Sequence, residues 1–471
     1  MLLILKKAVQ LPIEIWSLSR SLTAVDFSKQ WLKLALFSLL LSGLFSAVIV
    51  LARTPGLAEW ISDPLFARKS LVLHVDLALV VWFYAFLAVL YMSLTRTPFS
   101  LRIAAAMKTA MVGVGMMIVT VFLDAEPILA NYIPVLDHPL FLGGLLLFGV
   151  SLIITFSSGF SKPKIQSEQV KPSFYVDSAR EAIRYAGLLV LVAIITIITS
   201  WLITPEFAYR TTFYELVMWG GGHILQFANV LGMLTVWFIL LYKLTGSDAI
   251  SKKANRWLLL ILVLPAAIAP VLLINGTTSQ VYYAGFTQLM RWFIFPVVTV
   301  YMVIAFHAVW KARRSRIIKG SLFRNFYFNG LFVSILLTIT GFVIGAMIRG
   351  SSTLIPAHYH ASLGAVTVAY MVMVFILMKE YGYSLDGLKS SKLVSWQPLL
   401  FGVGQTVFVI GFAFAGLQGM GRKMFGQDQS IHTAEALIGL GLMSIGGLLA
   451  MAGGLLFIYI VVKSYQNGKK Q

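Results

Sequence analysis

Twelve long apolar runs decide what this chain can fold into. They lie at about 31–52, 70–94, 103–123, 138–159, 184–204, 212–242, 257–275, 284–310, 325–348, 356–378, 396–415 and 436–462. Each run is long enough to cross the ~30 Å of hydrocarbon in a bilayer as an α-helix. The composition agrees, because 59% of the residues are hydrophobic and only 12% are charged, far from the values of soluble domains. We therefore predict an all-α membrane protein with twelve transmembrane helices in one domain at 31–463, a lead-in at 1–30 and a tail at 464–471.

The positions of Lys and Arg predict how the chain is oriented in the membrane. A net charge of +19 would suggest nucleic-acid binding in a soluble protein, but here the cations gather in every second loop and at both termini. The loops on the other side hold only Arg53, Arg68, Lys69, Arg210, Arg349, Arg422 and Lys423. Because cytoplasmic loops carry the excess of Lys and Arg, we expect both termini in the cytoplasm. The charge then needs no nucleic-acid partner, and membrane lipid is the expected surrounding.

Two absences narrow the chemistry and the location. The chain has no cysteine, which excludes disulfides, iron–sulfur clusters, zinc–thiolate sites and covalently attached c-type haem. The first 30 residues lack a cleavable signal pattern, since Lys6 and Lys7 interrupt a short apolar stretch. We therefore expect an amphipathic cytoplasmic lead-in. The expected location of the whole protein is a bacterial inner membrane, in which it is integral.

Two histidines at the start of the tenth run form the most informative polar pair. In the segment from Ile355 to Ser362, one residue separates His358 from His360, and Pro356 fits the first turn of a helix. At about 100° per residue, the two side chains leave the helix axis roughly 200° apart. One helix can therefore offer a ligand to each of two sites, an arrangement suited to holding two haems side by side. The alternative is that both histidines cap the helix end and bind water.

His74, near the start of the second run, is expected at a similar depth in the membrane. The second and tenth runs both enter from the outer side in the predicted orientation, so His74, His358 and His360 share one layer. Polar side chains in lipid are costly and usually mark a functional site. Three imidazoles from distant parts of the sequence therefore favour a functional role over helix capping.

Two further sets of residues are candidates for the same site. The glycines Gly220–Gly222 precede His223 and leave a helix face without side chains, which a flat or bulky group can approach. The alternative is a close helix–helix contact, with His223 bonded to a neighbour. Arg422 and Lys423 are adjacent cations on the side with few cations, and haem propionates would pair with them through charge-assisted hydrogen bonds. The alternative there is a solvated loop.

These features together resemble subunit I of the haem–copper oxidase superfamily, which includes cytochrome oxidases and related nitric oxide reductases. The resemblance covers nearly the whole chain. It rests on twelve spans, a histidine in span 2, Trp219-x-x-x-His223 in span 6, Pro356-x-His358-x-His360 in span 10 and a basic pair between spans 11 and 12. It is closest to divergent members rather than to mitochondrial-type enzymes.

The resemblance implies a role for each candidate residue. His74 and His360 would be the two axial ligands of a low-spin haem, and His358 the proximal ligand of a second haem. His223 would correspond to the first copper ligand, on the distal side of that second haem. The pair Arg422-Lys423 would bind the haem propionates. Two haems, expected to be b-type, are thus the implied cofactors.

The chain also departs from the family pattern at the copper site. The family has two adjacent histidines in or just after span 7, whereas residues 264–275 contain none, and the tyrosine found in many oxidases is replaced by Phe227. The iron-ligand set of nitric oxide reductases, with its glutamate, is also missing. The remaining histidines are expected to be structural or solvated: His138, His307 and His432. Since one imidazole does not make a stable copper site, copper is not expected, and His223 is its only remaining ligand.

The resemblance implies a membrane haem oxidoreductase of a respiratory chain. Electrons from a partner subunit, a soluble cytochrome or quinol would pass through the low-spin haem to the second haem, which binds or reduces a small gaseous molecule such as dioxygen or nitric oxide. A non-catalytic dihaem electron-transfer or gas-sensing subunit is the alternative, and a transporter with buried histidines is a third. Four acidic residues are weaker candidates for a proton path: Asp76, Asp124, Glu126 and Glu215.

Overall fold

The computed structural model describes residues 24–54, 57, 63–95, 100–160, 171–207, 209–385, 391–422 and 433–468. The α-helices are α2 Ala24–Arg53, α3 Pro64–Val75, α4 Phe83–Thr95, α5 Leu101–Val119, α6 Pro139–Ser157, α7 Asp177–Ile203, α8 Arg210–Thr245, α9 Lys252–Ile268, α10 Gln280–Leu289, α11 Phe295–Arg314, α12 Phe326–Met347, α13 Leu354–Glu380, α14 Ser391–Leu417 and α15 Ala434–Gln466. The shorter elements are η2 Asp76–Trp82, η3 Thr120–Phe122, η4 Ser158–Phe160, η5 Ala269–Asn275, η6 Met290–Ile294 and η7 Leu322–Arg324, with strands β1 Glu126–Ile128 and β2 Val135–Asp137.

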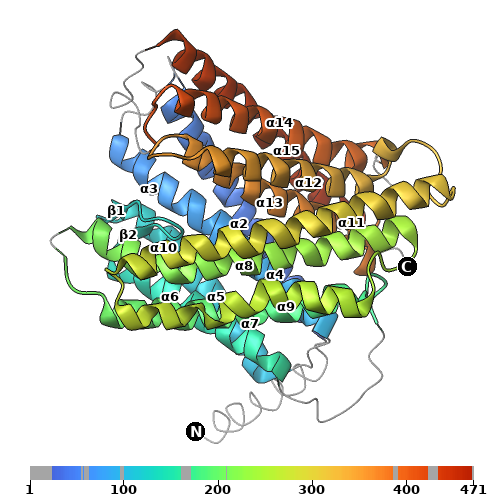
Figure 1. The fold of residues 1–471 in the computed structure, drawn as a ribbon, viewed down its shortest axis with the longest axis horizontal. Helices are drawn as coiled ribbons and strands as arrows, with labels where there is room; N and C mark the ends of the chain where they lie inside the picture. The colour runs from blue at the N-terminus through green and yellow to red at the C-terminus, as the bar shows by residue number, and fades with distance from the viewer. Residues whose placement is uncertain are drawn as a thin grey trace, which may run out of the picture.

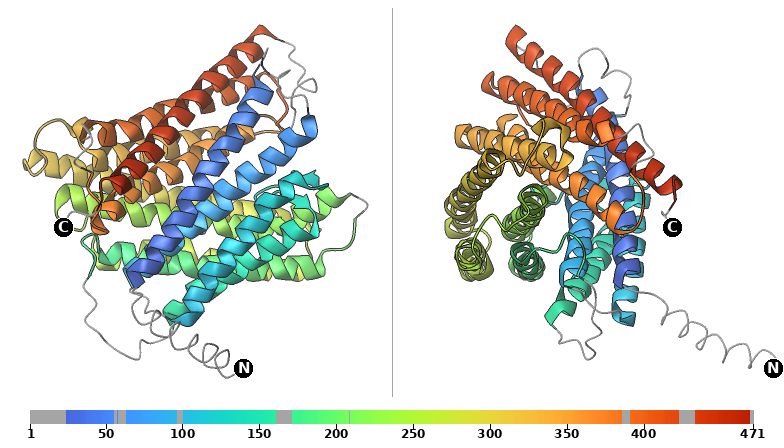
Figure 2. Two further views of the ribbon diagram at one scale, coloured as in Figure 1. Left: turned by 180° about the vertical axis from the view of Figure 1, so that it is seen from behind. Right: turned by 90° about the vertical axis from the view of Figure 1, so that its right-hand side faces the viewer.

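Twelve helices in the described residues are long and apolar enough to cross a membrane, which confirms the predicted number of spans. Three spans are built from more than one labelled element. Span 2 combines α3, η2 and α4, span 7 combines α9 and η5, and span 8 combines α10, η6 and α11. The helices run side by side through one bundle (Figures 1 and 2).

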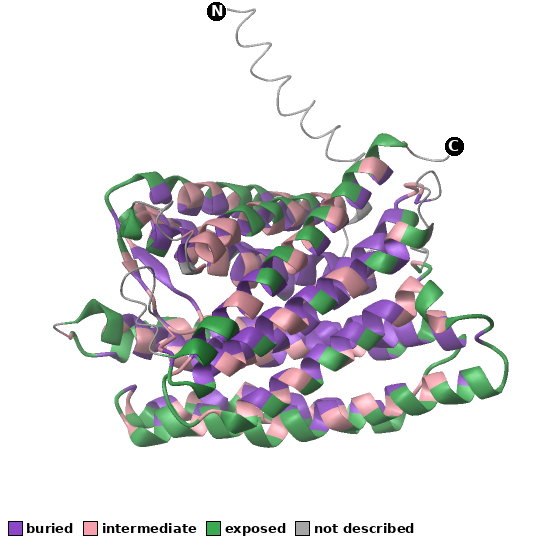
Figure 3. Ribbon diagram, turned by 90° about the horizontal axis from the view of Figure 1, so that it is seen from above, coloured by how far each residue is buried: buried purple, intermediate pink, exposed green. Residues whose placement is uncertain are grey.

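Spans 2, 6 and 10 form the centre of this bundle. Of their most apolar stretches, 83%, 89% and 83% of the residues are buried, whereas no other described span exceeds 56%. Figure 3 shows the same distribution, with buried residues concentrated in the middle and exposed residues on the outer helices. The three central spans are those that carry the histidines singled out in the sequence. A polar group placed there is removed from both lipid and water.

Span 2 begins earlier than its apolar run suggests. Asp63 caps α3, because its side chain accepts a hydrogen bond of 2.8 Å from the Leu65 amide, and Pro64 occupies the first turn, where no amide hydrogen is needed. We expected His74 about one turn into the helix, but it lies about three turns in. The reason is that capping by a polar residue, not hydropathy, sets the start of this helix.

The helix changes its winding two residues after His74. Residues Asp76–Trp82 form a π-helix, which is rare and often occurs at functional sites. The wider winding disturbs the usual pairing of backbone carbonyls, and Ser38 of α2 donates a hydrogen bond of 2.6 Å to the Leu77 carbonyl. Helix α2 therefore supports span 2 next to the histidine.

One end of the bundle carries a small antiparallel hairpin, β1 and β2, in which Glu126 pairs with Asp137 (Figure 1). Helix α3 packs against both strands, and α8 packs against β1. At the same end, the Thr353 amide just before α13 donates a hydrogen bond of 2.9 Å to the Met420 carbonyl, beyond the end of α14. The starts of the three histidine-bearing spans thus share one end of the molecule with this hairpin.

The predicted lead-in lies mostly outside the described residues, and α2 begins at Ala24, before the predicted boundary at residue 31. Lys423 and His432 also lie outside the described residues. Their predicted roles therefore have no structural description.

Candidate functional site

His74 is fixed by α2 through one of its two ring nitrogens. Its Nδ1 lies 3.0 Å from the Ser42 carbonyl oxygen. The Ser42 hydroxyl lies 3.0 Å from the same nitrogen and donates a hydrogen bond of 2.9 Å to the His74 carbonyl. Because a carbonyl oxygen can only accept, Nδ1 carries the proton and Nε2 has the lone pair. Metal-binding histidines are usually fixed in this way, because the ring N–H that does not face the metal donates to a carbonyl or carboxylate.

His358 has the same arrangement on a different helix. Its Nδ1 lies 2.7 Å from the Gly341 carbonyl oxygen of α12, so Nε2 again carries the lone pair. The ring also lies close to Gly345, where an added Cβ would come within 2.7 Å of Nδ1. A small residue on α12 is therefore required for this ring position.

His360 faces α14 instead. Its ring centroid lies 4.8 Å from that of Phe408 and 6.1 Å from that of Phe412, and its carbonyl accepts a hydrogen bond of 2.9 Å from the Gln405 side chain. The two imidazoles of span 10 thus contact different neighbours, as their spacing predicted. The two histidines do not both cap the helix end, because His358 lies in the second turn of α13 and its ring contacts α12.

His223 is buried in α8, with only 1% of its surface exposed, and both ring nitrogens have protein partners. Nδ1 lies 2.7 Å from the Trp219 carbonyl oxygen of the preceding turn, which makes Nε2 the acceptor. The Tyr132 hydroxyl lies 3.0 Å from Nε2. Burial raises the pKa of Tyr132, so the phenol keeps its proton and donates it to His223.

The glycine face next to His223 is filled by side chains rather than left open. Cβ atoms added to Gly220–Gly222 would meet Phe286 of α10, Ile197 of α7 and the Tyr132 ring, in that order along the chain. The face expected to admit a flat or bulky group thus admits the Tyr132 ring at Gly222. Neighbouring elements pack closely on this face of α8, as the alternative predicted, because glycine lets them approach the backbone.

No sequence pattern indicated Tyr132 as part of this site. It lies between β1 and β2 with a φ of 69°, a left-handed conformation that is strained for a bulky side chain. Its neighbour Asn131 accepts a hydrogen bond of 2.8 Å from Arg422. The hairpin loop is therefore attached at its tip to the loop that carries the predicted propionate-binding arginine.

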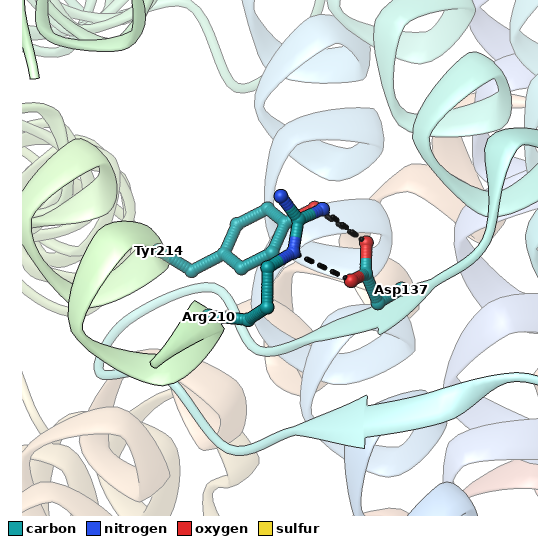
Figure 4. Close-up of polar contacts among 3 residues, drawn as sticks. All are labelled: Asp137, Arg210 and Tyr214. Atoms are coloured by element: carbon teal, nitrogen blue, oxygen red, sulfur yellow. Dashed lines mark hydrogen bonds and ion pairs between the residues drawn. The ribbon is translucent and has the colours of Figure 1, made fainter. Parts of the chain in front are cut away.

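The other end of the hairpin is attached to the start of α8 (Figure 4). Arg210 donates two hydrogen bonds of 2.8 Å to the Asp137 carboxylate, one to each oxygen, and Tyr214 donates a third of 2.8 Å. The Arg210 hydrogen bond holds the pKa of Asp137 below its usual value. This bidentate pair fixes β2 relative to the helix that carries His223.

The residues present fit haem iron. His74 and His358 each use Nδ1 for a carbonyl, and among the described residues Nε2 has no hydrogen-bond partner, which is the state that an axial ligand needs. They do not fit copper at His223, because Tyr132 occupies the required nitrogen. Within the described part of the chain, no group of three His, Cys, Asp or Glu could hold a metal ion.

The other predicted residues lie apart from these imidazoles or have structural roles. His138 caps α6 by accepting a hydrogen bond of 3.1 Å from the Leu140 amide, and His307 is exposed beside Trp310. Both are structural or solvated, as expected. The acids differ in burial: Asp124 and Glu126 are exposed, Glu215 is half-buried and Asp76 is fully buried.

Comparisons with known proteins agree with the fold. No family model matches the chain. An uncharacterized protein of Aquifex aeolicus is 26% identical, with 79% of this chain and 89% of that protein covered. An uncharacterized protein of Rickettsia prowazekii is 24% identical, with 93% and 96% covered. A haem–copper terminal oxidase, solved as a dimer by cryo-electron microscopy, superposes with a TM-score of 0.75 and 15% identity over 95% of this chain and 85% of that one. The chain is thus an integral membrane protein with the twelve-helix fold of a haem–copper terminal oxidase.

Proposed function

We propose that this protein is a membrane haem oxidoreductase that resembles the catalytic subunit, subunit I, of haem–copper oxidases and is a divergent member of that superfamily. Electrons would pass through a low-spin haem held by His74 and His360 to a second haem held by His358. The second haem would bind or reduce a small molecule such as dioxygen or nitric oxide. Arg422 and Lys423 would pair with haem propionates.

The observation that carries this proposal is the shared state of His74 and His358. Each ring is fixed through Nδ1 by a backbone carbonyl, at 3.0 Å and 2.7 Å, and each directs its remaining lone pair away from that carbonyl. Both residues are half-buried, and a histidine with a purely structural role inside a membrane would be expected to pair its second nitrogen, because an acceptor without a donor is costly away from water. Two separate helices with the same unsatisfied nitrogen support two metal-bound groups.

Haem would supply one-electron redox chemistry and a site for a gaseous ligand. The chain supplies orientation: the Ser42 and Gly341 carbonyls set the tautomer of their histidines and increase the basicity of Nε2. The side chains of Phe408 and Phe412 keep the His360 ring in an apolar environment, which disfavours charge separation near it.

The alternative function is a non-catalytic dihaem electron-transfer or gas-sensing subunit. The Tyr132–His223 hydrogen bond favours this alternative in one respect, because it leaves no imidazole nitrogen for a second metal beside the second haem. In either case we propose b-type haems in a bacterial inner membrane, with both termini cytoplasmic and electrons delivered by a partner subunit, a soluble cytochrome or quinol.

Visible spectroscopy of the detergent-purified protein tests the proposal. We expect a Soret band, a pyridine haemochrome value of two b-type haems per chain, and less than one tightly bound copper by elemental analysis. A change on adding carbon monoxide to the reduced protein would favour the oxidoreductase over the electron-transfer subunit. Absence of a Soret band after expression with added haem would refute both functions.

A further inference from the structure

In this chain the Nε2 lone pair of His223 accepts a hydrogen bond instead of binding a metal ion. The Trp219 carbonyl fixes the imidazole tautomer, so Nε2 can only accept a hydrogen bond or bind a metal. The Tyr132 hydroxyl, 3.0 Å away, supplies that hydrogen bond. A phenol therefore stands at the nitrogen that a metal ion would need.

Tyr132 is held in this position by contacts from two distant parts of the chain, helix α8 and the end of the α14 segment at Arg422. Its ring lies against the bare backbone of Gly222, where an added Cβ would come within 2.5 Å of the Tyr132 Cβ. Its ring centroid lies 4.7 Å from that of His223. Arg422 binds the neighbouring Asn131. A left-handed φ persists at a tyrosine only where its surroundings enforce it.

The second anchor of the hairpin limits movement of the loop as a whole. Asp137, at the end of β2, is bound by both Arg210 and Tyr214 of α8, the same helix that carries His223. The loop is therefore tied to α8 at two points, one through Asp137 and one through Tyr132. The Tyr132–His223 contact is built into the fold rather than left to a mobile side chain.

We propose that Tyr132 is a positioning residue that holds His223 away from the iron of the second haem and keeps one coordination position open for a small gaseous ligand. This inference rests on the proposed function, since it places a haem beside His223. A neutral imidazole with a free Nε2 is a strong ligand for haem iron. While Tyr132 donates to Nε2, that lone pair is occupied. Once the hydroxyl is removed, the iron of a haem bound beside His223 would be the partner for that lone pair.

The variant Tyr132→Phe tests this proposal, because it keeps the ring against Gly222 and removes only the donor. In the wild type we expect one low-spin and one high-spin haem by electron paramagnetic resonance and visible spectra. In Tyr132→Phe we expect the high-spin signal to decrease in favour of a second low-spin haem, with a matching loss of carbon monoxide binding. The double variant Tyr132→Phe, His223→Ala should restore both the high-spin signal and carbon monoxide binding.

Tyr283→Phe is the matched control. Tyr283 stacks on Trp219 with ring centroids 3.9 Å apart, and its substitution removes the same hydroxyl from a tyrosine that does not hydrogen-bond His223. We expect its spectra to match the wild type. Wild-type spin states and carbon monoxide binding in Tyr132→Phe would overturn the positioning role, as would a low-spin signal that persists in the double variant. Loss of the proposed function itself is distinguishable, because it would appear as absence of haem from the wild type.

Discussion

Replacing Gly222 by alanine would test whether the Tyr132 ring of the hairpin loop packs directly against the Gly222 backbone. The added methyl group would overlap the Tyr132 ring, with an approach of 2.5 Å to its Cβ, where real Cβ contacts do not occur. The tyrosine would have to move away from α8. Its hydrogen bond to His223 would then be lost.

The size of the effect follows from three terms. Overpacking of a well-packed site costs about 1–3 kcal/mol, and loss of one buried hydrogen bond costs about 1 kcal/mol. Alanine in a helix is more favourable than glycine by roughly 0.5–1 kcal/mol. The net destabilisation of Gly222→Ala is therefore about 2 kcal/mol, of which the displaced tyrosine accounts for the larger part.

The matched control is Gly115→Ala in α5, where an added Cβ has no heavy atom within 4 Å. That change should stabilise the protein by roughly 0.5–1 kcal/mol, so the two variants should differ by about 2–3 kcal/mol. Thermal unfolding in detergent, followed by tryptophan fluorescence, measures this difference as a melting temperature lower by a few degrees in Gly222→Ala. Equal melting temperatures of the two variants would refute the seating of Tyr132 on Gly222.

Three further predictions concern the ligands and the anchors. His74→Ala or His360→Ala should abolish the low-spin haem and much of the folded yield, because each supplies one axial bond between spans 2 and 10; sharp low-spin α-bands in both variants would contradict the assignment. Arg422→Ala with Lys423→Ala should weaken haem retention or shift its potential without preventing assembly, and unchanged potentials would favour a solvated loop. Asp137→Asn should lower stability near pH 7 by about 1 kcal/mol, a value discounted for screening because the Arg210 side chain is 53% exposed. Since the Asp137 pKa is lowered on folding, this contribution is present above the ordinary carboxyl pKa of about 3.9 and is lost as the pH falls through the folded pKa, so wild-type and variant melting curves should converge in acid.

The sequence predicted the number of spans and the opposed directions of His358 and His360, because both depend on local periodicity. A run of apolar residues long enough to cross a bilayer has little choice but to be helical. Side chains that lie two residues apart on a helix point to different neighbours. His358 contacts Gly341 of α12, and His360 contacts Phe408 of α14.

The sequence did not predict Tyr132 or the start of α3, because neither follows from periodicity. Tyr132 lies in a loop between two short strands, where no helical repeat indicates the direction of a side chain. The signals present were Asn131 and Pro134, which are typical of a turn but do not identify its partner. The contact with His223 bridges 91 positions in the sequence and depends on Gly222 lacking a side chain. Only the packing of the hairpin on α8 makes it visible.

The end of span 7, residues 269–275, bears on why the partner of His223 comes from the hairpin. A stable copper centre needs about three nitrogen or sulfur donors, and the family takes two of them from this segment. Here it is the 3-10 helix η5, in which Val271 is 64% exposed and Ile274 is 82% exposed, so these side chains point away from the bundle. Leu272 points inward but packs against Gly285 of α10. Residues 264–275 contain no histidine, and a buried Nε2 with no donor would be unfavourable by about 1–3 kcal/mol. Tyr132 removes that penalty by donating its hydroxyl hydrogen to Nε2.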